Sequence, residues 1–206
     1  MHSNEEMVAY LIHGGWIVSK EVRDAFLEVD RAMFVPPRAK SSAYHDSALP
    51  IGHGQTISAP SVVAFMLERL EIKKGMKILE LGTGSGHNTA LLSYLAGSKG
   101  KVISMDLYPE VTQFAKKHLR KYKNIELLTG DGSCGYGKKA SYDRIIVTAA
   151  MPSIEGHPLI GQLKKKGRLI APVGSRLSQN LVLYSEGNYQ EVLPVMFVPL
   201  VGKCGF

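Results

Sequence analysis

The stretch Lys77–His87, KILELGTGSGH, decides the fold expected for this chain. The apolar run Ile78–Leu81 is typical of a short buried strand, and it leads directly into the glycine-rich turn Gly82–Gly86. Apolar residues at helical spacing follow the turn. A strand, a glycine-rich turn and a helix in this order bring backbone close to a nucleotide in α/β proteins, because glycine has no Cβ and readily adopts positive φ.

The spacing of the glycines separates two classes of cofactor. A dinucleotide fingerprint reads G-x-G-x-x-G, whereas the third glycine here comes one residue earlier and His87 occupies the expected position. This shorter spacing, with Glu80 just before it, resembles the S-adenosylmethionine loop of class I methyltransferases. For the loop alone, a nucleotide site or a tight turn without a ligand is the alternative.

Length and composition predict a single globular domain. The 206 residues suffice for one core, and 45% hydrophobic and 21% charged residues are ordinary values for a soluble protein. No apolar run reaches about 18 residues, so we expect no membrane span, and the start, MHSNEEMVAY, lacks a signal-peptide layout. Cys134 and Cys204 lie far apart and outside any CxxC pair, so we expect no disulfide framework, no metal site and a cytoplasmic protein.

The formal charge of +7 raises the question of a nucleic-acid partner. The densest basic runs are Lys116–Lys123 and Lys164–Arg168, which we place on the outer face or at the end of a helix. No RNA-type motif of aromatic residues and glycines accompanies them. We therefore interpret both runs as solvated surfaces, and we expect a monomer without a nucleic-acid partner.

The pattern along the chain predicts an α/β fold. Helices are expected at 4–13, 20–29 and 60–70, with a long irregular stretch at 34–59 that we interpret as functional. From residue 77 the chain alternates between strands at 77–81, 101–106, 125–129, 142–147 and 168–173 and helices at 87–97, 109–122 and about 157–164. Two further runs, 180–184 and 192–198, suggest an antiparallel edge.

This alternation predicts a Rossmann-like, mostly parallel twisted sheet with helices on both faces. We expect one domain, 1–206, in which 1–70 supplies N-terminal helices and a substrate-side loop and 75–206 forms the cofactor-binding core. Ligands of such sheets bind beyond the carboxyl ends of the strands.

Four strand ends can therefore belong to one site. The first gives the glycine turn and the second gives Asp106, whose carboxylate can accept hydrogen bonds from both ribose hydroxyls. The third gives Asp131 and Gly132, and the fourth gives Thr148. Asp131 could accept a hydrogen bond from an adenine amine. The alternatives are a solvated strand end for Asp106 and an ordinary Asp-Gly turn for Asp131.

Motifs that are missing from the sequence exclude some classes of methyl acceptor. Enzymes that methylate exocyclic amines carry Asn/Asp-Pro-Pro-aromatic after the fourth strand, whereas this chain reads VTAAMPS. Cytosine C5 enzymes need a Pro-Cys nucleophile, and Cys134 lies in GSCGYG. A carboxylate acceptor has a pKa of about 4 and needs no general base. Its methylation depends on orientation and proximity.

Longer segments resemble the protein-L-isoaspartate (D-aspartate) O-methyltransferase family. They are DRAMFVPPRAKSSAYHDSALPIGHGQTISAP, GTGSGHNTALL, GDG at 130–132, SYDRIIVTAA, QLKKKGRLIAPVG and FVPLVGKCGF. The resemblance runs from about residue 5 to the end, and the LPIGHGQTISAP block is specific to this family among methyltransferases.

The resemblance implies methyl transfer from S-adenosylmethionine, leaving S-adenosylhomocysteine, to the free α-carboxylate of isoaspartyl residues in damaged peptides and proteins. The β-carboxylate of D-aspartyl residues is a second implied acceptor. The ester then collapses to a succinimide, whose hydrolysis returns some normal aspartate.

By position, the active-site serine of the family falls on Ser58. The residues implied to hold or flank the cofactor are Thr56, Ile57, Gly82, Thr83, Gly84, Ser85, Gly86, Asp106, Leu107, Asp131, Gly132 and Thr148. Two positions depart from the family pattern, because His87 stands where tyrosine is frequent and Asp106 where glutamate is usual. Without the resemblance, the position of Ser58 two residues before Pro60 favours an N-cap of the helix that starts there, and the two roles can coexist.

Three rival functions share parts of this pattern. A nucleic-acid methyltransferase would use the same cofactor fold, but the amine and C5 motifs are missing. A non-catalytic binding protein could retain the fold, although the Ser58 block and the glycine loop are intact. A nicotinamide oxidoreductase would need the later third glycine.

Overall fold

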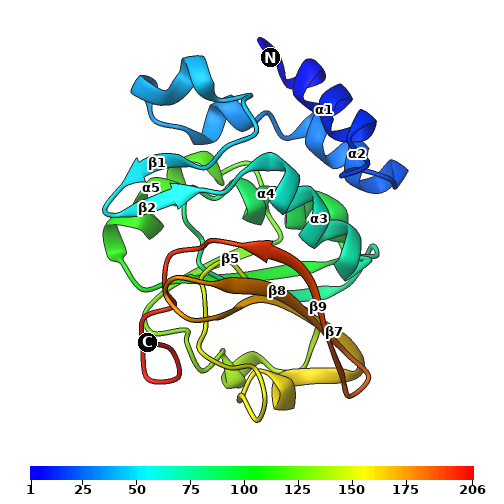
Figure 1. Ribbon diagram of the computed structural model, residues 1–206, viewed down its shortest axis with the longest axis vertical. Helices are drawn as coiled ribbons and strands as arrows, with labels where there is room; N and C mark the ends of the chain where they lie inside the picture. Colours follow the sequence, from blue (N-terminus) through cyan, green and yellow to red (C-terminus); the bar gives the residue numbers. More distant parts are fainter.

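The computed structural model describes all 206 residues, which form a twisted sheet with helices stacked on it (Figure 1). The N-terminal layer consists of α1 (Asn4–His13), α2 (Lys20–Glu28) and the 3-10 helices η1 (Arg31–Phe34) and η2 (Pro37–Ser42). The hydroxyls of Ser3 and Ser19 cap α1 and α2 by accepting backbone N–H groups of the first turns. None of the helices has both the length and the apolar character that a membrane span requires.

The main sheet has seven strands in the order β5-β4-β3-β6-β7-β8-β9. They are β3 (Lys77–Leu81), β4 (Lys101–Asp106), β5 (Ile125–Thr129), β6 (Tyr142–Val147), β7 (Leu163–Gly174), β8 (Gln179–Ser185) and β9 (Asn188–Val195). Strands β3 to β7 pair in parallel, and β8 and β9 add an antiparallel edge, which confirms the expected sheet. The chain runs outward from β3 to β5 and then returns to the other side of β3, so a ligand crevice is expected at the carboxyl end of β3.

All five α-helices lie on one face of the sheet, so the expectation of helices on both faces is met on the second face only by short 3-10 turns. α3 (Pro60–Leu70), α4 (His87–Ala96) and α5 (Pro109–His118) share with α1 and α2 a core of 31 buried residues that includes Ile78 and Val102 of the strands. The second face covers a core of 15 buried residues. Helices on this face are limited to 3-10 turns, η3 (Gly137–Lys139) and η4 (Ile160–Gln162). Glycines interrupt the connection from β5 to β6, and glycines and prolines interrupt that from β6 to β7.

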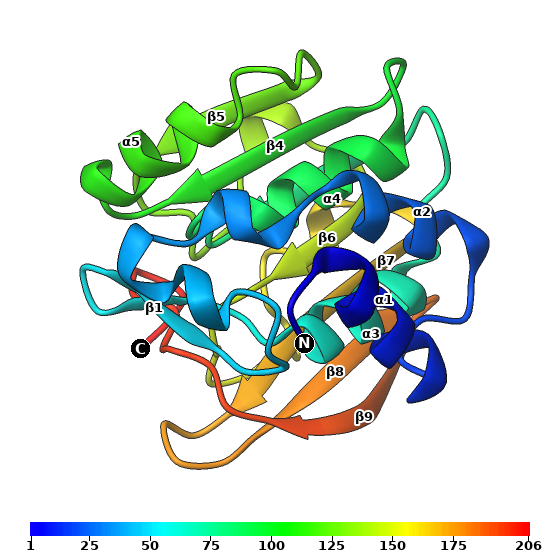
Figure 2. The ribbon, with the colours of Figure 1, turned by 90° about the horizontal axis from the view of Figure 1, so that it is seen from above.

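The stretch 34–59, expected to be irregular, is largely ordered. After η1 and η2 the chain forms an antiparallel hairpin of β1 (Leu49–Gly52) and β2 (Gln55–Ile57). Its turn holds Gly52, His53 and Gly54 at positive φ. Figure 2 shows the hairpin at the edge where the parallel strands end, beside the C-terminus. The prediction was wrong because short strands rich in glycine and proline have no clear local pattern.

Two predicted helix boundaries are also wrong. α5 ends at His118 rather than at 122, and a longer helix would place Lys116 four residues from the like-charged Arg120. The helix predicted near 157–164 is absent apart from η4, because Leu163 already pairs with Tyr142 as the first residue of β7. Pairing with a distant strand here overrides the local pattern.

Cys134 and Cys204 form a disulfide, contrary to the expectation from their separation in sequence. Cys134 lies in the loop after β5 and Cys204 near the C-terminus, and their Cα atoms are 5.1 Å apart. Two hydrogen bonds bring these segments together: Lys203 N–H donates to the Asp131 carboxylate, and Cys204 N–H donates to the Ser133 hydroxyl. The spacing of the cysteines carries no information about such contacts.

We expect this disulfide to stabilise the fold by about 4 kcal/mol, because it closes a loop of 70 residues and so restricts the unfolded chain. The double variant Cys134→Ser/Cys204→Ser should lose this free energy of unfolding in chemical denaturation without reductant. Dithiothreitol should destabilise the natural protein and leave the double variant unchanged. Superimposable unfolding curves for the two proteins would show that the bond contributes nothing.

Candidate functional site

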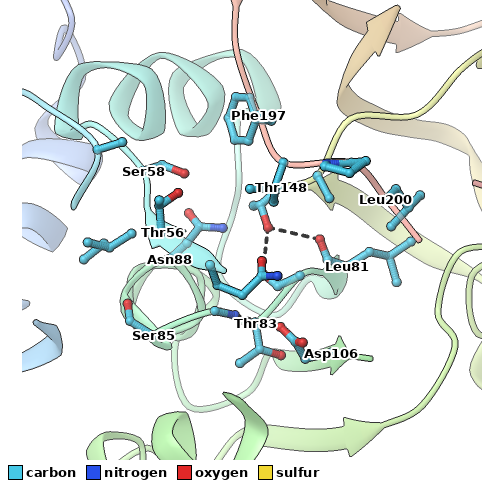
Figure 3. A pocket seen from close by; sticks show the side chains of 18 of the residues that line it. Thr56, Ser58, Leu81, Thr83, Ser85, Asn88, Asp106, Thr148, Phe197 and Leu200 are labelled. Atoms are coloured by element: carbon cyan, nitrogen blue, oxygen red, sulfur yellow. Dashed lines mark hydrogen bonds between the residues drawn. The ribbon is translucent and has the colours of Figure 1, made fainter. Parts of the chain in front are cut away.

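A pocket lies at the carboxyl ends of β3, β4 and β6, next to the β1–β2 hairpin (Figure 3). All but two of the predicted site residues line it: Thr56, Ile57, Ser58, Gly82, Thr83, Gly84, Ser85, Asp106, Leu107, Gly132 and Thr148. Figure 3 shows Thr56 and Ser58, from the hairpin side, facing the same space as Asp106 and Thr148 from the strand ends. The structure therefore joins residues that lie almost 100 positions apart in sequence.

The glycine turn keeps main chain open to the pocket. Gly82 has φ +93°, a conformation that favours glycine, and a Cβ added there would collide with the Thr148 side chain. The Thr148 hydroxyl donates to the carbonyl oxygens of Gly82 (2.6 Å) and Leu81 (3.1 Å), which ties the end of β6 to the end of β3. Gly82 and Gly84 both line the pocket, so a ligand there would meet main chain without side chains.

Asp106 ends β4 with its carboxylate at the pocket. One oxygen accepts from Gly84 N–H at 3.0 Å and the other from Tyr108 N–H at 3.2 Å. Only 8% of the residue is exposed, and burial raises the pKa of the carboxyl while the backbone N–H groups oppose the rise. Each oxygen keeps further acceptor capacity, so the group suits vicinal hydroxyls.

Glu80 lies one residue before the end of β3 and is fully buried beneath α4. Its carboxylate accepts hydrogen bonds from the Asn88 amide (2.7 Å) and from the hydroxyls of Thr89 (2.5 Å) and Ser104 (2.6 Å). Burial raises the pKa of Glu80 to about 7, and the three donors oppose this shift. Glu80 therefore fixes the first turn of α4 and the end of β4 behind the pocket rather than touching a ligand.

Ser58 is not the N-cap of α3. The cap position is Ala59, and the first turn is satisfied instead by Asp46, whose carboxylate accepts from Ser61 N–H at 2.9 Å. The Ser58 hydroxyl makes no hydrogen bond within the protein, while its carbonyl oxygen accepts from Arg31 Nη1 at 2.7 Å. The hydroxyl is thus available to a ligand. Asp46 and Arg31 were not identified from the sequence, because neither stands in a motif that signals contact with Ser58.

Two predicted cofactor residues lie outside the lining. Gly86 begins α4 at φ +88°, where a Cβ would press on Leu119 next to α5. Asp131 accepts Ser133 N–H at 2.8 Å and Lys203 N–H at 2.9 Å, so its carboxylate fastens the C-terminal segment. Binding of adenine by Asp131 stays a prediction.

The C-terminal segment Pro194–Val201 forms the remaining wall, which sequence reasoning missed. Ala150 N–H donates to the carbonyl oxygen of Val198 and Leu200 N–H donates to that of Ala150, which holds this segment beside the end of β6. Phe197 and Leu200 face the pocket across from the hairpin in Figure 3. The terminal FVPLVGKCGF motif was the only signal, and it did not indicate a position in space.

Comparisons with known proteins agree with this geometry. The family model for protein-L-isoaspartate(D-aspartate) O-methyltransferase matches residues 2–205. The chain belongs to this family. The protein-L-isoaspartate O-methyltransferase of Pyrococcus abyssi is 47% identical over 207 residues, covering 97% of this chain and 94% of that protein. That of Hyperthermus butylicus is 42% identical over 219 residues, covering 99% and 90%.

Solved structures give the same result for the fold. A protein-L-isoaspartate O-methyltransferase with 30% identity superposes with a TM-score of 0.87, covering 98% of this chain and 67% of that one. A Plasmodium falciparum structure described as the same enzyme, with S-adenosyl-L-homocysteine bound, has a TM-score of 0.87 at 24% identity and covers 98% and 99%. The family resemblance, the class I methyltransferase fold and the S-adenosylmethionine cofactor expected from the sequence are confirmed.

His87, where the resemblance implies tyrosine, is the first residue of α4 and packs against the N-terminal layer at the edge of the pocket lining. Only 1% of the residue is exposed, and neither ring nitrogen has a hydrogen-bond partner. The rings of Phe34 and Phe26 lie 5.4 and 6.1 Å from the imidazole, centre to centre. Burial, with the nearby Arg31 cation, lowers the pKa of His87 to about 3. The imidazole is therefore a neutral packing group in the folded protein.

This burial makes the contribution of His87 to stability sensitive to acid. At this site the unfolded state, with a histidine pKa of about 6.5, binds a proton more readily than the folded state between pH 6.5 and about 3, so the contribution of His87 falls as the pH drops through this window, whereas the raised pKa of Glu80 acts in the opposite direction. Lowering the pH from 7.5 to 5 should remove about 2 kcal/mol of unfolding free energy through His87. Denaturation curves of His87→Phe should lack this part of the pH dependence, and His13→Gln, at an exposed site, should retain it. Parallel pH profiles for His87→Phe and the natural protein would contradict the assignment.

Proposed function

We propose that this chain transfers the methyl group of S-adenosylmethionine to the free α-carboxylate of isoaspartyl residues, with D-aspartyl residues as a second acceptor, and that Ser58 orients the acceptor. One observation carries the proposal. The Ser58 hydroxyl has no partner in the protein and faces the pocket that the glycine turn and Asp106 also face. Methylation would begin repair, because the ester collapses to a succinimide that hydrolyses in part to aspartate.

The residues at the strand ends fit the cofactor. The Asp106 carboxylate would accept hydrogen bonds from the ribose hydroxyls of the cofactor. The main chain at Gly82 and Gly84 would pass close to the amino-acid part of the cofactor. Gly132 and Thr148 would line the cofactor site at the ends of the other strands. Thr56 and Ile57 would lie between the cofactor and the acceptor. When bound, S-adenosylmethionine supplies an electrophilic methyl group on a sulfonium. Asp131 and Gly86 would support this site from outside the lining.

The acceptor side needs orientation rather than a base. A carboxylate with a pKa of about 4 is already a nucleophile at neutral pH. The lining contains no lysine or arginine, so a carboxylate would be held by neutral donors such as the Ser58 hydroxyl. In an isoaspartyl residue the free carboxylate is attached directly to Cα. In an aspartyl residue the carboxylate is one methylene farther from Cα. A site that binds the peptide through its main chain would therefore hold this carboxylate away from the methyl group.

We also propose that the protein acts as a cytoplasmic monomer that does not bind nucleic acid. The basic runs Lys116–Lys123 and Lys164–Arg168 contribute nothing to the pocket lining, which supports a role as solvated surface. The disulfide counts against a reducing cytoplasm unless the organism is a hyperthermophile, since intracellular proteins of hyperthermophiles are the exception that carries such bonds.

Paired peptides of one sequence, with isoaspartyl or aspartyl at one position, test the function. Misplacement of the acceptor by about 1 Å costs on the order of 100-fold in rate, so we expect at least that preference for the isoaspartyl peptide in kcat/KM. The transferred label should be released by alkali, as expected for a methyl ester. Equal labelling of the two peptides, or alkali-stable label on added RNA or DNA, would refute the proposal.

Ser58→Ala separates the catalytic role from a structural one. The hydroxyl caps nothing, so the free energy of unfolding should change by less than the ~1 kcal/mol of a lost cap. The kcat/KM for isoaspartyl peptide should fall about 10- to 100-fold because the acceptor loses its orientation. Ser61→Ala is the matched control and should keep full activity. The backbone N–H of residue 61 donates to Asp46 whatever the side chain, so this contact remains in the variant. A Ser58→Ala enzyme with natural kcat/KM would remove Ser58 from the mechanism.

A further inference from the structure

The side chain of Arg31 is fully buried and forms no direct ion pair, although the carboxylate of Asp46 is near enough to favour its charged form. Its guanidinium donates to three carbonyl oxygens: Nε to Ala43 at 2.8 Å, Nη1 to Ser58 at 2.7 Å and Nη2 to Ser47 at 3.0 Å. Burial lowers the pKa of Arg31 to about 10, so the group stays a cation at neutral pH. Burying a charge costs free energy unless the group is fully hydrogen-bonded. The role of Arg31 must therefore lie in the backbone groups to which it donates.

The three carbonyl groups belong to the two legs of the β1–β2 hairpin. Ala43 and Ser47 precede β1, and Ser58 directly follows β2. Arg31 thus joins both legs at the base of the hairpin and connects them to η1 in the N-terminal layer. Asp46, on the same first leg, holds the second leg again through Ser61 N–H. The position of Ser58 is therefore set from the N-terminal layer and not from the sheet.

We propose that Arg31 is a positioning residue for methyl transfer, acting through the main chain of Ser58 to aim its hydroxyl at the acceptor carboxylate. This inference rests on the proposed function of Ser58. Arg31 does not line the pocket, so it touches neither acceptor nor cofactor. The cofactor side is held by other contacts, those of Asp106 and Thr148.

The chemistry of guanidinium explains why arginine stands here. Its planar fork presents donors in three fixed directions, as the three carbonyl groups require. A lysine would keep the charge but could not meet three carbonyl groups in this geometry. The cation is also one carbonyl away from Ser58, in a region whose pocket lining lacks lysine and arginine, so its field favours an anionic acceptor.

A double-mutant cycle tests the proposal, with kcat/KM for isoaspartyl peptide measured well below each unfolding midpoint. Arg31→Lys should lower kcat/KM about 10- to 100-fold, and S-adenosylhomocysteine should still raise the unfolding temperature as it does for the natural protein. If Arg31 acts through Ser58, then Arg31→Lys added to Ser58→Ala should cost less than threefold more. Turnover by the natural protein in the same assay establishes the proposed function independently of this result.

Arg144→Lys is the matched control for lost stability. Arg144 is a second buried arginine, 7% exposed, that donates to backbone carbonyl oxygens of Leu70, Glu71 and Asp143 away from the pocket. It should reduce the unfolding temperature and leave kcat/KM unchanged. Arg31→Gln, which avoids a buried ammonium, serves if Arg31→Lys does not fold. Additive losses with Ser58→Ala, a matching loss of cofactor binding, or failure of both Arg31 variants to fold would each overturn the positioning role.

Discussion

The cofactor half of the pocket depends on one buried group, the carboxylate of Glu80. It faces the helical side of β3 and receives donors from two other elements, Asn88 and Thr89 of α4 and Ser104 of β4. Removing a donor would leave a buried carboxylate incompletely satisfied, so the distances among β3, β4 and the start of α4 are narrowly set. The turn Gly82–Gly86 must cross this fixed gap in five residues, and its backbone conformation follows from that constraint.

The acceptor half is assembled from parts that are distant in sequence. The N-terminal layer holds the hairpin through Arg31, while the C-terminal wall is fastened to the loop after β5 by Asp131, Ser133 and the Cys134–Cys204 disulfide. Neither wall belongs to the βα units of the sheet. Under the proposed function, a common methyltransferase core receives its acceptor preference from these two added segments, in keeping with the rule that sites, rather than folds, determine function.

The sequence predicted the sheet far better than the walls of the site. β3, β4, β5 and β6 begin and end at the predicted residues, because each is an apolar run closed by glycine, charge or a turn. The β1–β2 hairpin, the disulfide and the wall Pro194–Val201 were missed or wrong, since each depends on contacts between segments that local pattern does not reveal. All but two of the site residues predicted from the strand ends and family motifs line the pocket, whereas Arg31 acts through a carbonyl oxygen, which any residue could supply.

The absence of cationic side chains from the pocket lining suits a reaction that cancels charge. A carboxylate and a sulfonium approach as an ion pair and leave as an ester and a thioether, so charge diminishes toward the transition state. Water stabilises the separated ions more than that transition state, and a pocket that excludes water removes this disadvantage. Apolar residues such as Met66, Phe197 and Leu200 contribute to the lining, and its one Asp side chain, Asp106, is bound to backbone N–H groups. A lysine beside the acceptor would hold the carboxylate as an ion pair and lower its nucleophilicity, which explains why the cation Arg31 lies behind Ser58 and not in the pocket.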